Sequence, residues 1–203
     1  MFTGGPAKHF EVAGRNQLAV LLEHGLHTSS RVLDIGCGAL RGGYWIMRVL
    51  DPGCYFGIEP NREMLQAGLD HLVEPDVLAR AQPRFDYNDR FDFAVFGVKF
   101  DFYVARSIWT HSSKTQLEAM LDGFVATAVP EAMMLASILP VTEKRPDYKG
   151  GAWIGRSHES DDPGTVAHDW AWLETACRVR GLSIAETGPN VLNQVWVEVA
   201  RSS

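Results

Sequence analysis

The chain has 203 residues, of which 46% are hydrophobic, and this length suits a single domain with one sizeable core. Its formal net charge is -6, and no block of Lys or Arg occurs. Nucleic-acid binders normally carry a concentrated basic face, so the composition argues against a nucleic-acid partner.

The N-terminal half alternates between helical and strand patterns. Residues 14–25 place leucines at helical spacing and end at a glycine, which predicts a helix with a glycine stop. A buried strand is expected at 32–35 and a helix at 44–50. A second strand follows at 54–60, and a helix capped by an asparagine follows at 61–72. This alternation is typical of βαβ units and a parallel sheet.

The C-terminal half continues the pattern and ends in a hairpin. Helices are expected at 114–128 and 168–181. The segment TGPNVL between the last two strands is too short for a helical crossover, so these strands should pair antiparallel. Further strands are expected at 83–88, 100–106, 133–139, 182–187 and 193–200. The predicted fold class is α/β: a seven-stranded, mostly parallel, doubly wound sheet with an antiparallel C-terminal edge strand and helices on both faces.

Cysteine usage and hydropathy indicate the compartment. Cys37, Cys54 and Cys177 are scattered, which fits neither a disulfide framework nor a CxxC metal site, so we expect a reducing setting and no metal. No window approaches the ~18 apolar residues that a membrane span needs. A cytoplasmic protein without a membrane partner is therefore predicted, and the sequence is compatible with a homodimer.

A glycine-rich turn follows the first predicted strand, in RVLDIGCGALRGG at 31–43. Two nucleotide-type ligands compete for such a turn. The dinucleotide fingerprint G-x-G-x-x-G/A needs glycine or alanine where this chain has Arg41. The alternative pattern, D-x-G-x-G, is met by Asp34, Gly36 and Gly38. An NAD(P)-binding oxidoreductase stays open as an alternative function.

On these residues the chain resembles the class I S-adenosylmethionine-dependent methyltransferases. The first motif of that family looks like VLDIGCG at 32–38, and an acid follows at the end of the second strand, here Glu59 in YFGIEP. The resemblance covers roughly residues 30–140. The chain departs from the family at Leu40, where glycine is common.

The resemblance implies S-adenosylmethionine as cofactor and S-adenosylhomocysteine as product. Glu59 would accept both ribose hydroxyls, and Asp34 would complement the ammonium group of the cofactor. The glycines would let the backbone approach the ligand closely. The cofactor-binding residues expected are Asp34, Gly36, Cys37, Gly38, Arg41, Glu59, Asp89, Phe91 and Ala105.

The third and fourth strands of the family supply further matches. Asp89 and the Phe-Asp pair at 100–101 have the family's spacing, and SIWTH at 107–111 resembles the stretch after the fourth strand. Asp89 would then accept from the adenine amine, and Phe91 would flank the ring. A solvated turn explains Asp89 as well, because DYNDRFD offers three acids. Cys37 would also suit a small core position, and Arg41 a surface position.

The implied reaction is an in-line displacement, for which the protein mainly supplies alignment and exclusion of water. A general base is needed only for a hydroxyl or an acidic carbon, and His111 is the first candidate, with His158 second. His111 could instead cap the helix that begins near it.

Two segments are free to cover a pocket: residues 1–13 and a loop excursion at 141–167, rich in Gly, Pro, Asp and Ser. We expect both to form a lid, and Trp153 lies in the second. Modest size without an added recognition domain favours a small-molecule acceptor, whose O, N or C nucleophile the sequence does not identify. A non-catalytic S-adenosylmethionine-binding partner protein is the remaining alternative.

Overall fold

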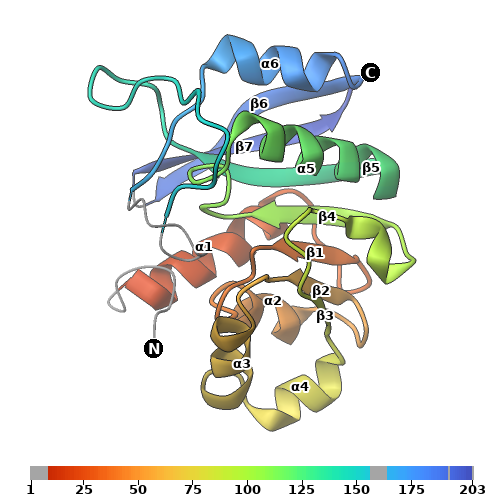
Figure 1. The fold of residues 1–203 in the computed structure, drawn as a ribbon. Helices are drawn as coiled ribbons and strands as arrows, with labels where there is room; N and C mark the ends of the chain where they lie inside the picture. The colour runs from red at the N-terminus through yellow and green to blue at the C-terminus, as the bar shows by residue number, and fades with distance from the viewer. Residues whose placement is uncertain (1–8, 156–163, 192, 203) are drawn as a thin grey trace.

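A computed structural model describes residues 9–155, 164–191 and 193–202 of the chain. Within them one sheet has the strand order β3-β2-β1-β4-β5-β7-β6 (Figure 1). The strands are β1 (Val32–Ile35), β2 (Tyr55–Ile58), β3 (Arg84–Asp86), β4 (Phe100–Ala105), β5 (Ala128–Ile138), β6 (Leu182–Val191) and β7 (Gln194–Arg201). The predicted seven-stranded, mostly parallel sheet is confirmed.

The sheet reverses its order at β1. This strand pairs in parallel with β2 on one side and with β4 on the other. At the far end, β7 pairs antiparallel with both β5 and β6, which confirms the predicted antiparallel pairing of the last two strands. Ligands of open α/β sheets bind outside the carboxyl ends of the strands at such a reversal, so the topology directs attention to the ends of β1, β2 and β4.

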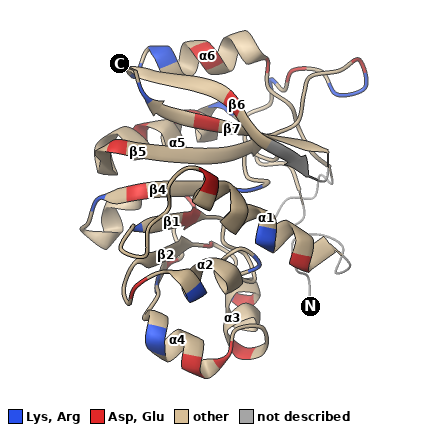
Figure 2. Ribbon diagram, turned by 180° about the vertical axis from the view of Figure 1, so that it is seen from behind, with Lys and Arg blue, Asp and Glu red and all other residues tan. Residues whose placement is uncertain are grey.

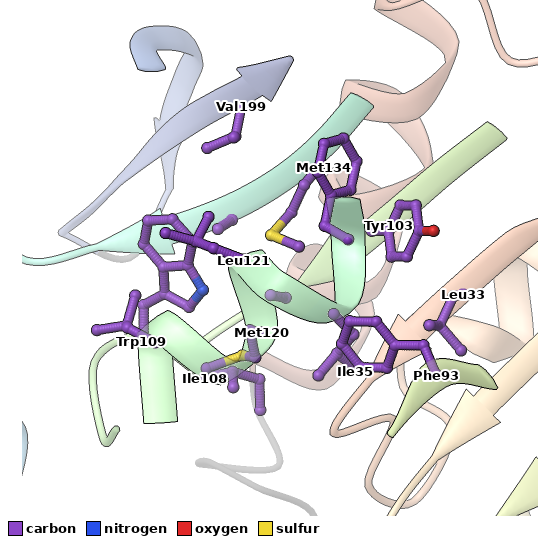
Figure 3. Packing of buried hydrophobic residues seen from close by; sticks show 14 of the residues in the cluster. Leu33, Ile35, Phe93, Tyr103, Ile108, Trp109, Met120, Leu121, Met134 and Val199 are labelled. Carbon is purple, nitrogen blue, oxygen red and sulfur yellow. The ribbon is translucent and has the colours of Figure 1, made fainter. Parts of the chain in front are cut away.

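Helices cover both faces of the sheet, and the side chains of β1 alternate between the two cores. Leu33 and Ile35 belong to one cluster, whereas Val32 belongs to the other. Figure 3 shows Leu33 and Ile35 near Phe93 and Tyr103 in the first cluster. The helices are α1 (Phe10–Glu23), α2 (Gly43–Val49), α3 (Arg62–His71), α4 (Pro75–Ala81), η2 (Phe93–Phe96), α5 (Lys114–Thr127) and α6 (Trp170–Arg178).

The first cluster receives side chains from η2, α5 and α6, and the second receives side chains from α1, α2 and α3. Each fully buried large apolar side chain stabilises the fold by about 1.5–3 kcal/mol relative to exposure. Helices therefore cover both faces of the sheet, as the sequence predicts.

Side-chain caps define where the helices after β2 and β4 begin. Asn61 Oδ1 accepts from the Met64 amide at 3.0 Å, which confirms the predicted cap. Ser113 and Gln116 form a reciprocal capping box at the start of α5. Ser113, rather than His111, therefore caps that helix.

Several boundaries differ from those predicted. The first helix starts at Phe10 instead of residue 14, so residues 10–13 of the predicted lid are its first turn, and residues 1–8 lie outside the described residues. Strand β5 starts at Ala128 instead of residue 133. The sequence pattern hides this start, because it contains Pro130 and because the register of β5 with β4 shifts near Phe100. The short helices α4 and η2 were not predicted.

The excursion packs against the segment that connects β4 to α5. The Ile154 amide donates to the His111 carbonyl at 2.8 Å, and the Val166 amide donates to the Thr110 carbonyl at 2.8 Å. Lys114 Nζ forms an ion pair with Asp147 at 2.7 Å. The described parts of the excursion, 141–155 and 164–167, thus lie close to the carboxyl end of β4.

Charges of both signs are interspersed along helices such as α1 and α4 (Figure 2). Among the described residues, no helix combines the length and the apolar composition that crossing a bilayer requires. The three cysteines of the chain are free thiols.

Candidate functional site

One cavity lies at the carboxyl ends of β1, β2 and β4. Of the residues predicted for the cofactor or for catalysis, its wall brings together Asp34, Gly36, Cys37, Gly38, Arg41, Glu59 and His111. The remaining lining residues are Gln17, Ala39, Gly42, Met64, Arg106, Ser107, Ile108 and Trp153. The cavity therefore lies where the reversal of strand order predicts a ligand site.

Glu59 follows β2 and is only 2% exposed. Its Oε2 accepts from the Gly38 amide at 2.9 Å, and its Oε1 accepts from the Asn61 amide at 2.8 Å. Burial raises the pKa of Glu59 from 4.5 to about 7, although both backbone hydrogen bonds oppose the rise. Each carboxylate oxygen keeps a further lone pair with which it can accept from a ligand.

Asp34 lies within β1 and is also buried. Its Oδ2 accepts from the Tyr55 hydroxyl at 2.7 Å. Burial raises the pKa of Asp34 from 3.8 to about 6, while the Tyr55 hydrogen bond and the positive charge of Arg41 oppose the rise. The cavity thus contains two carboxyl groups that titrate close to neutral pH.

The structure favours glycine at the two positions of the turn for different reasons. Both have positive φ, 67° at Gly36 and 55° at Gly38. A Cβ on Gly36 would lie 2.1 Å from Ile108 Cδ1, so Gly36 is needed for packing within the protein. A Cβ on Gly38 would meet only Met64 Sδ, at 3.8 Å, so the space beside Gly38 is open to a ligand. Only Gly38 forms the kind of cradle that close approach of a ligand needs.

Cys37 lies between these glycines, and its buried side chain also belongs to the second hydrophobic cluster. Burial raises the pKa of its thiol well above the ordinary value, and the charges of Asp34 and Glu59 act in the same direction. The thiol is therefore protonated at neutral pH and behaves as a small apolar group.

Two arginines contribute positive charge to the wall. Arg106 follows β4 and is 7% exposed, and its guanidinium lies 5.1 Å from the centroid of the Trp196 ring. Burial and the positive charge of Arg41 lower the pKa of Arg106 from 12.5 to about 10. Burial also lowers the pKa of Arg41, whereas Asp34 raises it. Both guanidinium groups remain charged at neutral pH.

Ser107 has a φ of 59°, which is unusual for a residue with a side chain. Its amide donates to Ser137 Oγ at 2.8 Å, and Gln194 Nε2 donates to Ser107 Oγ at 2.8 Å. These bonds link the ends of β4, β5 and β7. Strained backbone of this kind often occurs at ligand sites, and here it turns the chain along the cavity wall.

His111 and Trp153 form the side of the cavity next to the excursion. Their rings stack with centroids 5.6 Å apart and planes 24° apart. His111 Nδ1 lies 2.6 Å from the Ile154 carbonyl oxygen, which can only accept, so Nδ1 carries the proton in the neutral ring. Burial lowers the pKa of His111, while hydrogen bonds to Ile154 and Gly164 oppose this. His111 is therefore mostly neutral at pH 7.

The other predicted site residues do not line this cavity. Asp89 is exposed, and Phe91 packs against the first hydrophobic cluster with a φ of 57°. Ala105 is fully buried as the last residue of β4. His158 lies outside the described residues. The roles of these four residues stay predictions.

Sequence reasoning missed several lining residues. Gln17 comes from α1, and its amide nitrogen donates to the Ala13 carbonyl, so nothing in its local sequence points to the site. Arg106 and Ser107 had a usable signal, because they directly follow a buried strand whose carboxyl end should meet that of β1. An arginine that directly follows the strand paired with β1 is therefore a candidate site residue in any sheet of this type.

Comparison with known proteins bears on the fold. No family model matches the chain, and no curated protein matches it in sequence. Magnesium protoporphyrin IX methyltransferase ChlM from Synechocystis PCC 6803, solved with bound S-adenosylmethionine, is similar with a TM-score of 0.65 and 18% identity over 96% of this chain and 80% of that chain. DesVI from Streptomyces venezuelae is similar with a TM-score of 0.67 and 17% identity over 97% of this chain and 93% of that chain. The chain has the class I methyltransferase fold.

A third structure of this fold, the glycopeptide N-methyltransferase MtfA, is similar with a TM-score of 0.66 and 15% identity over 93% of this chain and 90% of that chain. Identities this low establish the class I methyltransferase fold alone. The structural similarity confirms the fold that the first motif predicts. The reaction has to be inferred from the residues of the cavity.

Gly36→Ala and Gly38→Ala provide a matched test of the two glycines. Each should lose about 1–2 kcal/mol because an L-residue is strained at positive φ. Gly36→Ala should lose more, because its methyl group also displaces the buried side chain of Ile108. Urea denaturation of both variants measures the difference. Equal stability, or a less stable Gly38→Ala protein, would contradict this assignment.

The raised pKa of Glu59 predicts a pH dependence of stability. The folded protein holds this proton more tightly than the unfolded chain, so stability should fall as pH rises from 4.5 to about 7. Glu59→Gln cannot titrate, so the ligand-free variant should lose less stability between pH 5 and pH 8 than the wild type. Asp34 acts in the same direction and is present in both proteins. Urea midpoints that change equally in both would refute the prediction.

Proposed function

We propose that the protein is an S-adenosylmethionine-dependent methyltransferase that acts on a small-molecule acceptor. The observation that carries the proposal is the open space beside Gly38, bounded by the carboxylate of Glu59 and next to Asp34, at the sheet reversal of a class I methyltransferase fold. ChlM has been solved with S-adenosylmethionine and with S-adenosylhomocysteine, and human N-acetylserotonin methyltransferase with S-adenosylmethionine, which supports the same ligand class here.

The chemistry of the wall fits this cofactor. Glu59 can accept from the two ribose hydroxyls through lone pairs that its backbone hydrogen bonds leave available. Asp34 offers a negative charge to the ammonium group, and a bound cation would favour its ionised form. For the adenine ring we retain Asp89 and Phe91, and for the adjoining strand end Ala105, as proposals from the sequence.

When bound, the cofactor supplies a methyl group on a positively charged sulfur that is already activated for displacement. The protein then has to align the acceptor and exclude water. Ile108 and Trp153 give the wall apolar surface for this purpose. Hydrogen bonds to His111 and Thr110 hold the described parts of the excursion beside the cavity, and we propose that these parts and residues 1–13 form a lid over the acceptor.

We further propose that His111 takes the acceptor proton where the acceptor is a hydroxyl, with His158 as the second candidate. The proton on Nδ1 leaves the lone pair on Nε2, as a general base requires. The lowered pKa of His111 keeps the ring neutral at pH 7.

Glu59→Ala tests the cofactor proposal. The variant should bind S-adenosylhomocysteine more weakly by about 2 kcal/mol, a factor of about 30, because it lacks the acceptor for the ribose hydroxyls. Isothermal titration measures the affinity, with Glu63→Ala, an exposed position on α3, as the matched control. Unchanged affinity in a cooperatively folding Glu59→Ala protein would remove Glu59 from the site. Binding of NADH instead of S-adenosylhomocysteine would favour an oxidoreductase.

His111→Gln tests the base. A methyl-transfer assay over a panel of hydroxyl and amine metabolites gives the acceptor and its pH–rate profile. We expect the wild-type acidic limb to have an apparent pKa below 6.5, since burial lowers the pKa of His111, and His111→Gln to abolish that limb. His71→Gln, at the exposed end of α3, is the control. A full rate with an unshifted limb would exclude His111, and S-adenosylhomocysteine binding without turnover on any acceptor would favour a non-catalytic partner protein.

A further inference from the structure

The N-terminal helix α1 supplies one side chain to the cavity wall, that of Gln17. This residue is only 5% exposed. Its amide nitrogen donates to the Ala13 carbonyl at 3.3 Å, and among the described residues this is the one hydrogen bond of the side chain. A carboxamide has a second N–H donor and an oxygen with two lone pairs. These groups of Gln17 are therefore available to a ligand in the cavity.

Two glycines let α1 lie close to the glycine-rich turn. A Cβ on Gly42 would lie 2.3 Å from Gln17 Oε1, and a Cβ on Gly14 would lie 2.3 Å from the Arg41 carbonyl oxygen. Gly42 has an ordinary helical φ of -75°, and Gly14 lies inside α1, so neither backbone conformation needs glycine. The absence of a side chain at both positions allows the close contact, which places the Gln17 carboxamide directly against Gly42.

Contacts on either side of Gln17 fix its position. Asn16 Oδ1 accepts from Trp196 Nε1 at 2.8 Å, and both side chains are buried. One turn further along α1, Val20 and Leu21 belong to the second hydrophobic cluster. A polar side chain on a helix that is anchored in this way loses little conformational freedom when it binds a ligand.

Gln17 lies at the end of the cavity that Asp34 and Arg41 form. Gly42, which the carboxamide contacts, directly follows Arg41, and Arg41 interacts electrostatically with Asp34. Glu59, which we assign to the ribose, is hydrogen-bonded to an earlier part of the same turn. Since Asp34 is the proposed partner of the ammonium group, the carboxamide lies beside the amino-acid end of a bound cofactor.

The amino-acid end needs more hydrogen-bond partners than Asp34 provides. An ammonium group has three donors, and a carboxylate has about four acceptor sites. Asp34 Oδ2 already accepts from the Tyr55 hydroxyl at 2.7 Å. Charged groups that enter a buried wall without partners lose binding energy. A carboxamide suits both groups of an amino acid, because its oxygen accepts from an ammonium and its N–H donates to a carboxylate, and it adds no net charge.

We propose that Gln17 binds the amino-acid end of the cofactor, with its oxygen accepting from the ammonium group and its second N–H donating to the carboxylate. Helix α1 is then part of the binding site, and the protein distinguishes ligands that have an amino-acid end from truncated thioadenosines. This inference rests on the proposed function, because the amino-acid end is located relative to Asp34.

The test compares S-adenosylhomocysteine with 5′-methylthioadenosine, which has the same nucleoside and a thioether but no amino-acid end. Isothermal titration should show that the wild-type protein binds S-adenosylhomocysteine at least about tenfold more tightly. Gln17→Ala should lose about tenfold in affinity for S-adenosylhomocysteine, because hydrogen bonds to charged groups are lost. Its affinity for 5′-methylthioadenosine should stay within about twofold of the wild type.

Gln17→Met separates hydrogen bonding from packing. Methionine keeps the length of the side chain and its contact with Gly42 but lacks the amide, so this variant should show the same selective loss. Gln66→Ala, which removes an exposed glutamine on α3, is the matched control and should keep both affinities. Urea denaturation checks that each variant folds cooperatively, and Gln17→Met decides alone where Gln17→Ala does not fold.

Unchanged affinity for S-adenosylhomocysteine in a folded Gln17→Met protein would overturn the inference. An equal loss of affinity for both ligands would also overturn it, because Gln17 would then act on the nucleoside or only on the packing of α1. Wild-type protein that does not prefer S-adenosylhomocysteine over 5′-methylthioadenosine would do the same. Wild-type protein that binds neither ligand would refute the proposed function instead.

Discussion

The two backbone hydrogen bonds accepted by Glu59 hold the cavity together. One ties the carboxylate to Gly38 in the turn after β1, and the other ties it to Asn61, whose side chain caps α3. The same carboxylate thereby fixes the distance between two loops that belong to neighbouring strands. Its burial raises the pKa to about 7, so the contribution of Glu59 to stability falls as the pH rises from 4.5 to about 7. A group that costs stability and yet faces a cavity is typical of a ligand site.

Charge balance within the cavity extends this reasoning. Asp34 and Glu59 provide negative charge at the ends of β1 and β2, whereas Arg41 and Arg106 provide positive charge beside β1 and after β4. Within a low-dielectric wall these charges interact strongly, and Arg41 moderates Asp34 while it repels Arg106. A ligand with both an ammonium group and a carboxylate complements Asp34 and Arg41.

The sequence predicts those parts of the molecule that local pattern determines. Buried β-branched runs, turn glycines and the Asn61 cap locate β1, β2 and α3, and their spacing implies a parallel sheet. What escapes prediction depends on contacts between distant segments. Gly36 is required by Ile108, a residue far along the chain, and Gln17 reaches the cavity only because α1 packs beside α2. The start of β5 escapes for a different reason, since Pro130 breaks a strand pattern that tertiary pairing with β4 restores.

The connection between His111 and the excursion joins the proposed lid to the proposed base. His111 accepts from the Ile154 amide through its carbonyl, and its ring donates to the Ile154 carbonyl, so two hydrogen bonds join the same two residues. Because the partner atoms on Ile154 belong to the main chain, a substitution there leaves both in place unless it introduces proline, which lacks the amide donor. The orientation and tautomer of the ring consequently depend on the excursion being in place. If His111 acts as the base, proton transfer is coupled to the position of the segment that carries Trp153, and an acceptor is deprotonated only in a cavity that the excursion has closed on that side.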